Sequence, residues 1–225
     1  MDKAIVNMPV KEQVAAETDM AIDNSSTSKN IPTLQELLKS GVQFGHEVKR
    51  WNPKMRKYIY DEKNKIHIID VTKTLDKLKE AFNFLKEAAS RGHILFVGTK
   101  RQASDIIKEG SIKAGAYFVN SRWAGGLLTN FQIVKKSLDK LISIEKALEE
   151  GVEGRTKYEV SKMKKEWQRL DRLYSGIKTL HSKPTAIVVV DALYEKSAIR
   201  ECKKIGIPIV GIVDTNSDPD VVDFI

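Results

Sequence analysis

The chain alternates short apolar runs with longer segments in which apolar residues recur every three or four positions. Five apolar runs are rich in β-branched residues and predict strands: 65–70, 93–99, 116–120, 185–191 and 207–214. Helical patterns between them cover three segments: 72–90, 101–114 and 194–205. Near-continuous apolar strands are typical of a parallel sheet covered on both faces. The alternation therefore predicts an α/β fold with a doubly wound, mainly parallel sheet.

Residues 129–180 break this alternation, because two longer helical patterns follow each other there. The tetrapeptides TNFQ (129–132) and TKYE (156–159) both have the form of a capping box that opens a helix. The apolar residues of the two helices keep heptad spacing, with Glu145 at one vacant step of the first: Val134, Leu138, Leu141 and Leu148, then Val160, Met163, Trp167, Leu170, Tyr174 and Ile177. This pattern predicts an antiparallel coiled-coil hairpin that projects from the sheet.

The N-terminal segment differs in composition from the rest of the chain. Residues 1–32 are polar and non-periodic, which predicts a disordered extension, and they match neither a signal peptide nor a transit peptide. Order is expected to begin with a capping box formed by Thr33 and Glu36, on a helix that stops at Gly41. The predicted α/β domain therefore comprises residues 33–128 and 181–225, with the hairpin inserted at 129–180. No apolar run reaches the length of about 20 residues that a bilayer requires.

The charge of the chain favours a polyanionic partner. The net charge is +8, but residues 1–32 contain three lysines and five acids, which leaves 35 basic and 25 acidic side chains in the rest. A surplus of this size is typical of proteins that bind nucleic acid, although a merely soluble basic surface is the alternative. The single cysteine, Cys202, excludes an internal disulfide and fits a reducing compartment.

The segment VKRWNPKMRKY (48–58) is the densest basic stretch, with five cations, no acid and two aromatic residues. Cations hold phosphates, and aromatic rings stack on bases or riboses. Pro53 predicts that the segment is extended rather than helical. The alternative is that Trp51 packs on the domain and that the cations are only solvated.

The segment NSRWAGGLLTNF (120–131) joins a predicted strand to the first hairpin helix. Its two glycines allow a tight turn or a close approach to a phosphate, and Thr129 is expected to cap the helix. Trp123 is equally compatible with packing in the core and with RNA contact. Together with the basic stretch, these features give the candidate RNA-binding residues: Lys49, Arg50, Trp51, Asn52, Lys54, Arg56, Lys57, Lys100, Arg101, Arg122, Gly125, Gly126 and Asn130.

Three predicted strands end in aspartate, at Asp70, Asp191 and Asp214, where ligands bind in doubly wound sheets. Helix capping explains the same positions. The chain has no P-loop, no G-x-G-x-x-G and no zinc-like spacing of histidine and cysteine. DTNSDPD (214–220) starts like a calcium loop but has Pro219 where the turn requires glycine. We therefore predict no cofactor, no metal, no small-molecule substrate and no catalysis; a nucleotide-using enzyme with these three aspartates as ligands remains the alternative.

The order of the longer motifs resembles the family of ribosomal protein two of the bacterial small subunit. The segments that carry the resemblance, spread over about residues 33–225, are GVQFGHEVKRWNPKMRKYIY, IHIIDVTKT, ILFVGTKRQA, VNSRWAGGLLTNF, GIKTL and IPIVGIVDTNSDPD. The resemblance implies a non-enzymatic cytoplasmic protein of the bacterial ribosome, with the same α/β domain and hairpin. It also implies binding to small-subunit ribosomal RNA between head and body, next to other ribosomal proteins. One of these is the large mRNA-binding ribosomal protein one, whose docking the family supports.

The sequence departs from this family at three places. Members usually continue beyond residue 225, through a Pro-Gly-Asn-Asp segment into a final helix, and an end at Ile225 would leave the last strand less well supported. The polar extension lies outside the family's common core, and Ala124 replaces a frequent leucine. A protein-interaction scaffold, in which the hairpin binds partners and RNA contact is incidental, is a further alternative.

Overall fold

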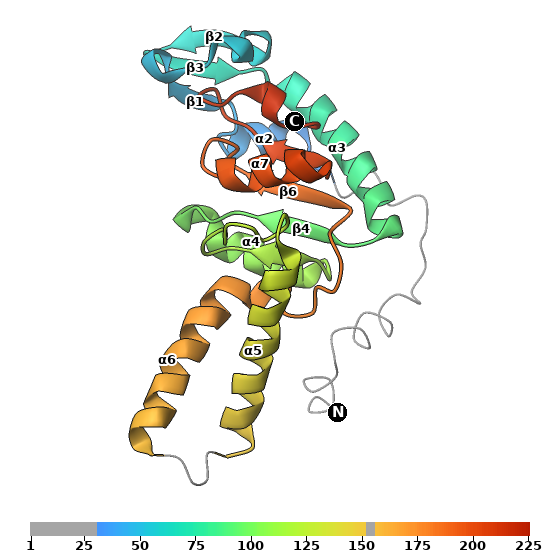
Figure 1. Cartoon of the computed structure of the whole chain (residues 1–225). Helices are drawn as coiled ribbons and strands as arrows, with labels where there is room; N and C mark the ends of the chain where they lie inside the picture. The colour runs from blue at the N-terminus through green and yellow to red at the C-terminus, as the bar shows by residue number, and fades with distance from the viewer. Residues whose placement is uncertain (1–30, 152–155) are drawn as a thin grey trace, which may run out of the picture.

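The core of the protein is a four-stranded parallel sheet. The computed structural model describes residues 31–151 and 156–225. The sheet has the strand order β5-β4-β6-β7, with these bounds: β4 Ile94–Val97, β5 Tyr117–Val119, β6 Ala186–Val190 and β7 Ile209–Ile212. Its central strands β4 and β6 are labelled in Figure 1. All three strand pairings are parallel. The structure thus confirms a mixed α/β fold built on a parallel sheet, and four of the five predicted strands belong to it.

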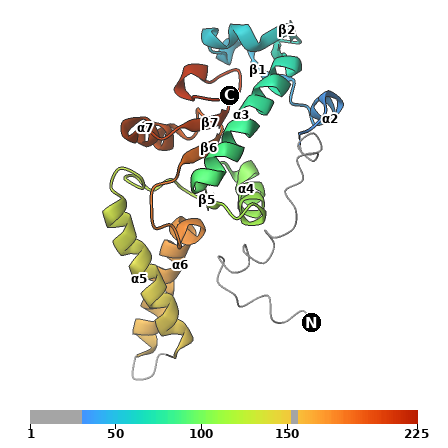
Figure 2. The same cartoon turned by 90° about the vertical axis from the view of Figure 1, so that its right-hand side faces the viewer.

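Helices cover both faces of this sheet. Helix α3 (Val71–Arg91) packs through Ala81 against Val188 and Val210 on one face. Helix α7 (Lys196–Ile205) packs on the other face, where the largest cluster of buried residues lies. Helix α4 (Arg101–Lys113) connects β4 to β5 and lies on the same side as α3 in Figure 2. None of the helices in the described part of the chain combines the length and apolar character that crossing a membrane demands.

The predicted strand at 65–70 is not part of the parallel sheet. It forms β3 (Ile66–Ile69), the centre of a separate antiparallel sheet between β1 (Phe44–Glu47) and β2 (Ile59–Lys63). A two-residue turn with positive φ at Asn64 and Lys65 joins β2 to β3. The placement in the parallel sheet was wrong because an apolar run does not reveal the direction of its neighbours, and because β1 and β2 are too polar or too short to be recognised as strands.

The first described helix, α2 (Leu34–Lys39), begins and ends as the sequence predicts. Thr33 and Glu36 form both hydrogen bonds of the capping box, and Gly41 follows the helix with φ +79°. Residues 1–30, and with them most of the predicted disordered extension, lie outside the described residues.

Helices α5 (Phe131–Glu149) and α6 (Lys157–Tyr174) lie side by side and form an arm that extends away from the sheet (Figure 1). Leu141, Ile144 and Leu170 form a buried cluster between them, and Leu148, Met163, Trp167 and Tyr174 pack against it half-buried. Ile144 fills the step that the heptad pattern assigned to Glu145, whose carboxylate pairs instead with Lys178 at 2.9 Å. Leu138, expected in the arm, belongs to the core of the α/β domain because α5 starts against the sheet.

Candidate nucleic-acid interface

The basic strip, residues 48–58, is built from two short 3-10 helices. They are η2 (Val48–Arg50) and η3 (Pro53–Tyr58). The prediction of an extended segment was wrong, since Pro53 occupies the first helical turn, where its fixed φ fits and its missing N–H costs nothing. The Asn52 side chain caps η3 by accepting a hydrogen bond from the Lys54 backbone N–H at 3.0 Å.

Backbone contacts anchor the strip to the segment that follows β7. The Asn52 N–H donates to the Thr215 carbonyl at 2.8 Å. Just before the strip, the His46 N–H of β1 donates to the Thr215 hydroxyl at 2.8 Å. Gly45 is needed here, because a Cβ on it would lie 2.5 Å from the Thr215 methyl group. Met55 inserts below η3 and is only 2% exposed. The strip is therefore a fixed part of the domain surface.

Trp51 is half-buried at the centre of the strip. Its ring packs against the buried His67 ring of β3, with centroids 5.1 Å apart and planes at 51°. Part of the indole is therefore accessible while His67 holds its position, so the structure supports both a packing contribution and an accessible aromatic surface.

One of the five cations of the strip is neutralised within the protein. The Lys54 ammonium lies 2.8 Å from Asp218 and 2.9 Å from Asp220, at the start of the short helix η5 (Pro219–Val221). These hydrogen bonds, first to Asp218 and then to Asp220, raise the pKa of Lys54. Lys54 thus connects the strip to the segment that contains Asp218 and Asp220. A contact of Lys54 with RNA, which the sequence predicts, would have to compete with this ion pair.

The other cations of the strip have different surroundings. Lys49, Arg50 and Arg56 are exposed, and their side chains form neither ion pairs nor hydrogen bonds with any described residue. The Lys57 ammonium lies 5.1 Å from the centre of the Tyr58 ring, and the Lys57 carbonyl accepts a hydrogen bond from Lys73 of α3. Three cations on short helices fixed at both ends are thus available to an external anion.

The elbow, residues 120–131, is organised by a single carboxylate. Glu201 of α7 accepts hydrogen bonds from the Trp123 indole N–H at 2.9 Å and from the Gly126 backbone N–H at 2.7 Å. It also accepts from the Leu128 N–H and from both the N–H and the hydroxyl of Thr129. Partial burial opposes ionisation of Glu201, but the donors led by Trp123 and Gly126 outweigh it and lower the pKa of the carboxyl group.

These contacts correct the prediction that Thr129 caps α5, and they bear on the alternatives left open for Trp123 and Gly126. Trp123 is 7% exposed and lies in the main core, so it is a packing residue. Thr129 does not cap α5: the cap position is Asn130, without a side-chain hydrogen bond, and the Thr129 hydroxyl donates to Glu201. Gly126 has φ +83°, which explains the glycine, but its N–H is already used by Glu201 and is not available to a phosphate.

The remaining predicted RNA-binding residues are spread over several positions. Arg101, Arg122, Gly125 and Asn130 are exposed, and their side chains, where present, have no partner among the described residues. Lys100 is different, because its ammonium lies 2.9 Å from Asp191. This hydrogen bond raises the pKa of Lys100.

The three aspartates that follow strands have separate roles. Asp70 caps α3, as one interpretation predicted. Asp191 has φ +69°, accepts hydrogen bonds from two backbone N–H groups of the following turn and pairs with Lys100. Asp214 caps no helix and lies 2.9 Å from the imidazole of His46. Within residues 31–151 and 156–225 no group of three or more acidic, histidine or cysteine residues is arranged to hold a metal ion.

The position between β4 and β6, where ligands bind in doubly wound sheets, is occupied by side chains of the protein. The Lys100–Asp191 pair lies there, next to the buried Glu195, which accepts hydrogen bonds from the N–H and hydroxyl of Thr99 at 2.7 and 2.6 Å. Burial raises the pKa of Glu195, and the Thr99 hydrogen bonds only partly offset this.

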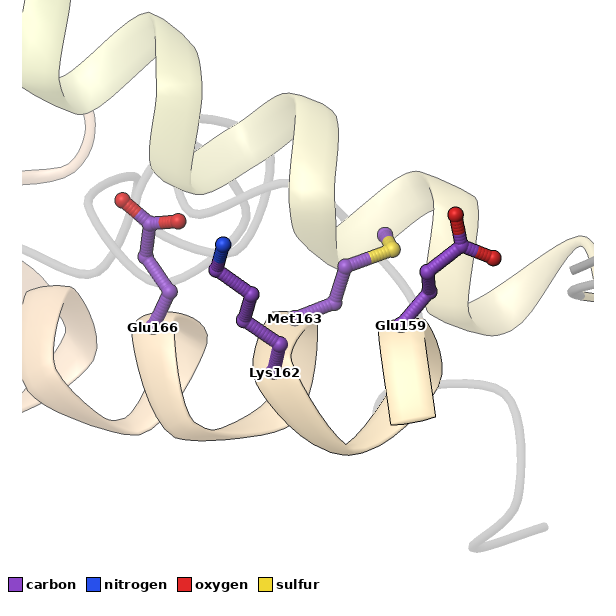
Figure 3. A pocket seen from close by; sticks show the side chains of 4 residues that line it. All are labelled: Glu159, Lys162, Met163 and Glu166. Carbon is purple, nitrogen blue, oxygen red and sulfur yellow. The ribbon is translucent and has the colours of Figure 1, made fainter. Parts of the chain in front are cut away.

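An open hollow lies on the arm, away from this position. It is lined by Glu159, Lys162, Met163 and Glu166 of α6 (Figure 3).

Sequence reasoning missed Glu201, Asp218 and Asp220 as determinants of this interface. Each binds a residue more than 70 positions away in the sequence. No local sequence pattern predicts a contact of that kind. The only available signal for Glu201 was its position beside the buried Cys202 on the apolar side of an amphipathic helix.

A comparison with protein families matches residues 37–225 to the family described as Ribosomal protein S2. The match covers the parallel sheet, the antiparallel sheet with the basic strip, the elbow and the arm. Because it spans most of the chain, the protein belongs to the ribosomal protein S2 family, a family of structural proteins of the small ribosomal subunit.

Proposed function

We propose that this protein binds small-subunit ribosomal RNA between the head and the body of the subunit, with the basic strip as its principal contact. The observation that carries the proposal is the fixed display of Lys49, Arg50 and Arg56, which are exposed and unpaired among the described residues. Phosphate contacts of this kind supply most of the affinity for a nucleic acid. The accessible part of Trp51 adds a surface for stacking on a base or ribose.

The strip contains a matched pair of cations that tests this proposal. Arg56 and Lys54 lie two residues apart on η3, but Lys54 is paired with Asp218 and Asp220 whereas Arg56 is not. Arg56→Gln should reduce the slope of log K against log salt by about 0.7–0.9, the value of one phosphate contact. Lys54→Gln removes the same charge and should leave the slope nearly unchanged. Equal slopes for the two variants would contradict a contact made by unpaired cations.

The protein also supports docking of the large mRNA-binding ribosomal protein one during translation, within a bacterial cytoplasmic ribosome. Membership of the family supports this part of the proposal. Small subunits reconstituted without this chain should retain less of protein one than complete subunits, and adding back the full chain should restore it. Equal retention with and without the chain would remove docking from the function.

The arm functions as a coiled-coil hairpin whose seam holds its two helices in register. The buried positions Leu141, Ile144 and Leu170 support this assignment, as does the ion pair of 2.6 Å between Lys140 and Glu166. Leu141→Ala should destabilise the arm by about 2–5 kcal/mol, since the residue is fully buried. Hydrogen exchange should then accelerate in α5 and α6 and remain slow in β4 and β6; uniform acceleration would contradict a separate seam.

A further inference from the structure

One face of α6 carries four cations, with a single acid, Asp171, at its edge. Residues seven or eight positions apart lie on the same side of a helix, so the α6 basic face comprises Lys157, Lys164, Lys165 and Arg172, with Ser161 and Gln168 between them. All six are exposed. From Lys157 to Arg172 the face extends over about 22 Å, at the usual rise of 1.5 Å per residue.

Each acid of α6 has a partner inside the protein, including Asp171, which lies seven positions after Lys164. Glu159 forms the capping box with Thr156. Glu166 pairs with Lys140 of α5, and Asp171 pairs with Lys178 at the base of the arm. Within the described part of the chain, the side chains of Lys157, Lys164 and Lys165 form no ion pair or hydrogen bond. Their charges are therefore not compensated inside the protein.

The second helix of the arm shows that this distribution is not general. The exposed lysines of α5 lie close to acids on the same helix: Lys135 and Lys136 precede Asp139 by four and three positions, and Lys146 precedes Glu149 by three. Such neighbours reduce the positive potential of the α5 surface. The arm thus has one face on which unpaired cations predominate and one face of mixed charge.

Two features connect the α6 basic face to the nucleic-acid interface. The Arg172 Nε–H donates to the Ser121 hydroxyl at 3.0 Å, next to the exposed Arg122 of the elbow. At the other end of the helix, Tyr158 is 77% exposed and lies seven positions before Lys165, so its ring borders the face. Cations in a row with an exposed aromatic ring are the combination that binds a phosphate backbone and stacks on a base or ribose.

We propose that the α6 basic face is a second RNA-binding surface, which holds the phosphate backbone of small-subunit ribosomal RNA along the arm. This inference rests on the proposed function and extends it from the α/β domain to the arm. The elbow then links two contacts, the basic strip and the α6 basic face, on one rigid scaffold.

The full chain is tested with the triple variant Lys157→Gln, Lys164→Gln and Lys165→Gln, and small-subunit ribosomal RNA as the probe. Arg172 is left intact because it also contacts Ser121. The control, Lys135→Gln, Lys136→Gln and Lys146→Gln on α5, removes the same charge from the mixed face. Glutamine keeps a high helix propensity, so both variants should retain the helical content of the wild type.

The α6 variant should lower the slope of log K against log salt by about 2, since each phosphate contact contributes about 0.7–0.9. The α5 variant should stay within about 0.5 of the wild-type slope, because a lysine without a phosphate contact adds little to it. Equal slopes for the two variants, with strong binding by the wild type, would overturn the inference alone. Wild-type protein without salt-dependent affinity would overturn it together with the proposed function. An α6 variant that binds RNA normally but no longer assembles into subunits would assign the face to an acidic protein instead.

Discussion

The basic strip and the elbow contain similar kinds of residue. The strip exposes most of their polar groups to solvent, whereas the elbow hydrogen-bonds them inside the protein. Both contain a tryptophan and a residue that restricts or frees the backbone, together with five cations in the strip and one, Arg122, in the elbow. In the strip, short helices hold most cations at the surface, and only Lys54 turns to acids of the protein. In the elbow, the indole and three backbone N–H groups turn inward to Glu201.

The difference depends on where the nearest carboxylate lies in the fold. Asp218 and Asp220 reach one cation of the strip from its edge, so the remaining cations stay uncompensated. Glu201 lies below the elbow and accepts five hydrogen bonds there. The donors of a basic and aromatic motif are therefore available to an external partner only where no carboxylate of the protein already satisfies them.

The largest effect is expected at the tryptophan of the elbow. Trp123→Ala removes a buried ring and leaves Glu201 without its indole donor, which should lower the free energy of unfolding by about 3–5 kcal/mol. Urea unfolding of the full chain measures this. Trp51→Ala is the matched variant in the strip and should cost clearly less stability, since that ring is half-buried. Equal costs would break the distinction between the two regions.

Replacing the carboxylate itself should have the next largest effect. Glu201→Ala leaves the N–H groups of Gly126 and Leu128 and the Trp123 indole without an acceptor, at a total cost of about 3 kcal/mol. Arg122 lies in the same loop and its side chain is exposed. The free energy of unfolding of Arg122→Ala should therefore stay within about 0.5 kcal/mol of the wild-type value. Comparable losses in the two variants would mean that Glu201 does not organise the elbow.

Trp51 should affect RNA binding more specifically than folding. If its accessible surface stacks on a base, Trp51→Ala lowers RNA affinity by about 1–3 kcal/mol with little change in the salt slope. Fluorescence binding titrations at several salt concentrations separate the two quantities. Loss of stability without loss of affinity would assign Trp51 to packing on His67 alone.

The smallest effect concerns pH. The folded-state pKa of Glu201 is lowered, so its contribution to stability is present above the unfolded value near 4.5 and is lost as pH falls through the folded pKa. The pKa of Glu195 is raised, so its contribution is present below 4.5 and is lost as pH rises through the folded pKa. Glu201→Gln should therefore flatten the loss of stability below pH 4.5, and Glu195→Gln should flatten the loss of stability as pH rises above 4.5. The same pH profile for both variants would contradict these opposite roles.

The parallel sheet could be predicted from the sequence because its signal is local. The strands β4 to β7 are continuous apolar runs, and the boundaries of α3, α4 and α7 fall within two residues of the predicted ones. The predicted capping boxes are present at Thr33 and Thr156, where the start of the helix is exposed. The box at Thr129 failed because Glu201, 72 positions away, competes for its hydroxyl.

The surroundings of the candidate site residues were harder to predict because they depend on long-range pairing. The sequence located the strip and the elbow, yet Lys54 and Lys100 are paired with acids more than 90 positions distant. The antiparallel sheet that carries the strip was missed because β2 is mostly exposed and polar. The basic face of α6 was not predicted because its cations are seven or eight positions apart and are interleaved in the sequence with the apolar residues of the seam.

The most direct test of the contrast between strip and elbow is the salt dependence of ribosomal RNA binding by two variants. Lys49→Gln, Arg50→Gln and Arg56→Gln together remove the unpaired cations of the strip and should lower the slope of log K against log salt by about 2–3. Glu201→Gln alters the elbow and, as long as the protein remains folded by circular dichroism, should leave the slope close to that of the wild type. A triple variant that keeps the wild-type slope, or a Glu201→Gln variant that loses it, would contradict the assignment of RNA binding to the strip and of structural support to the elbow.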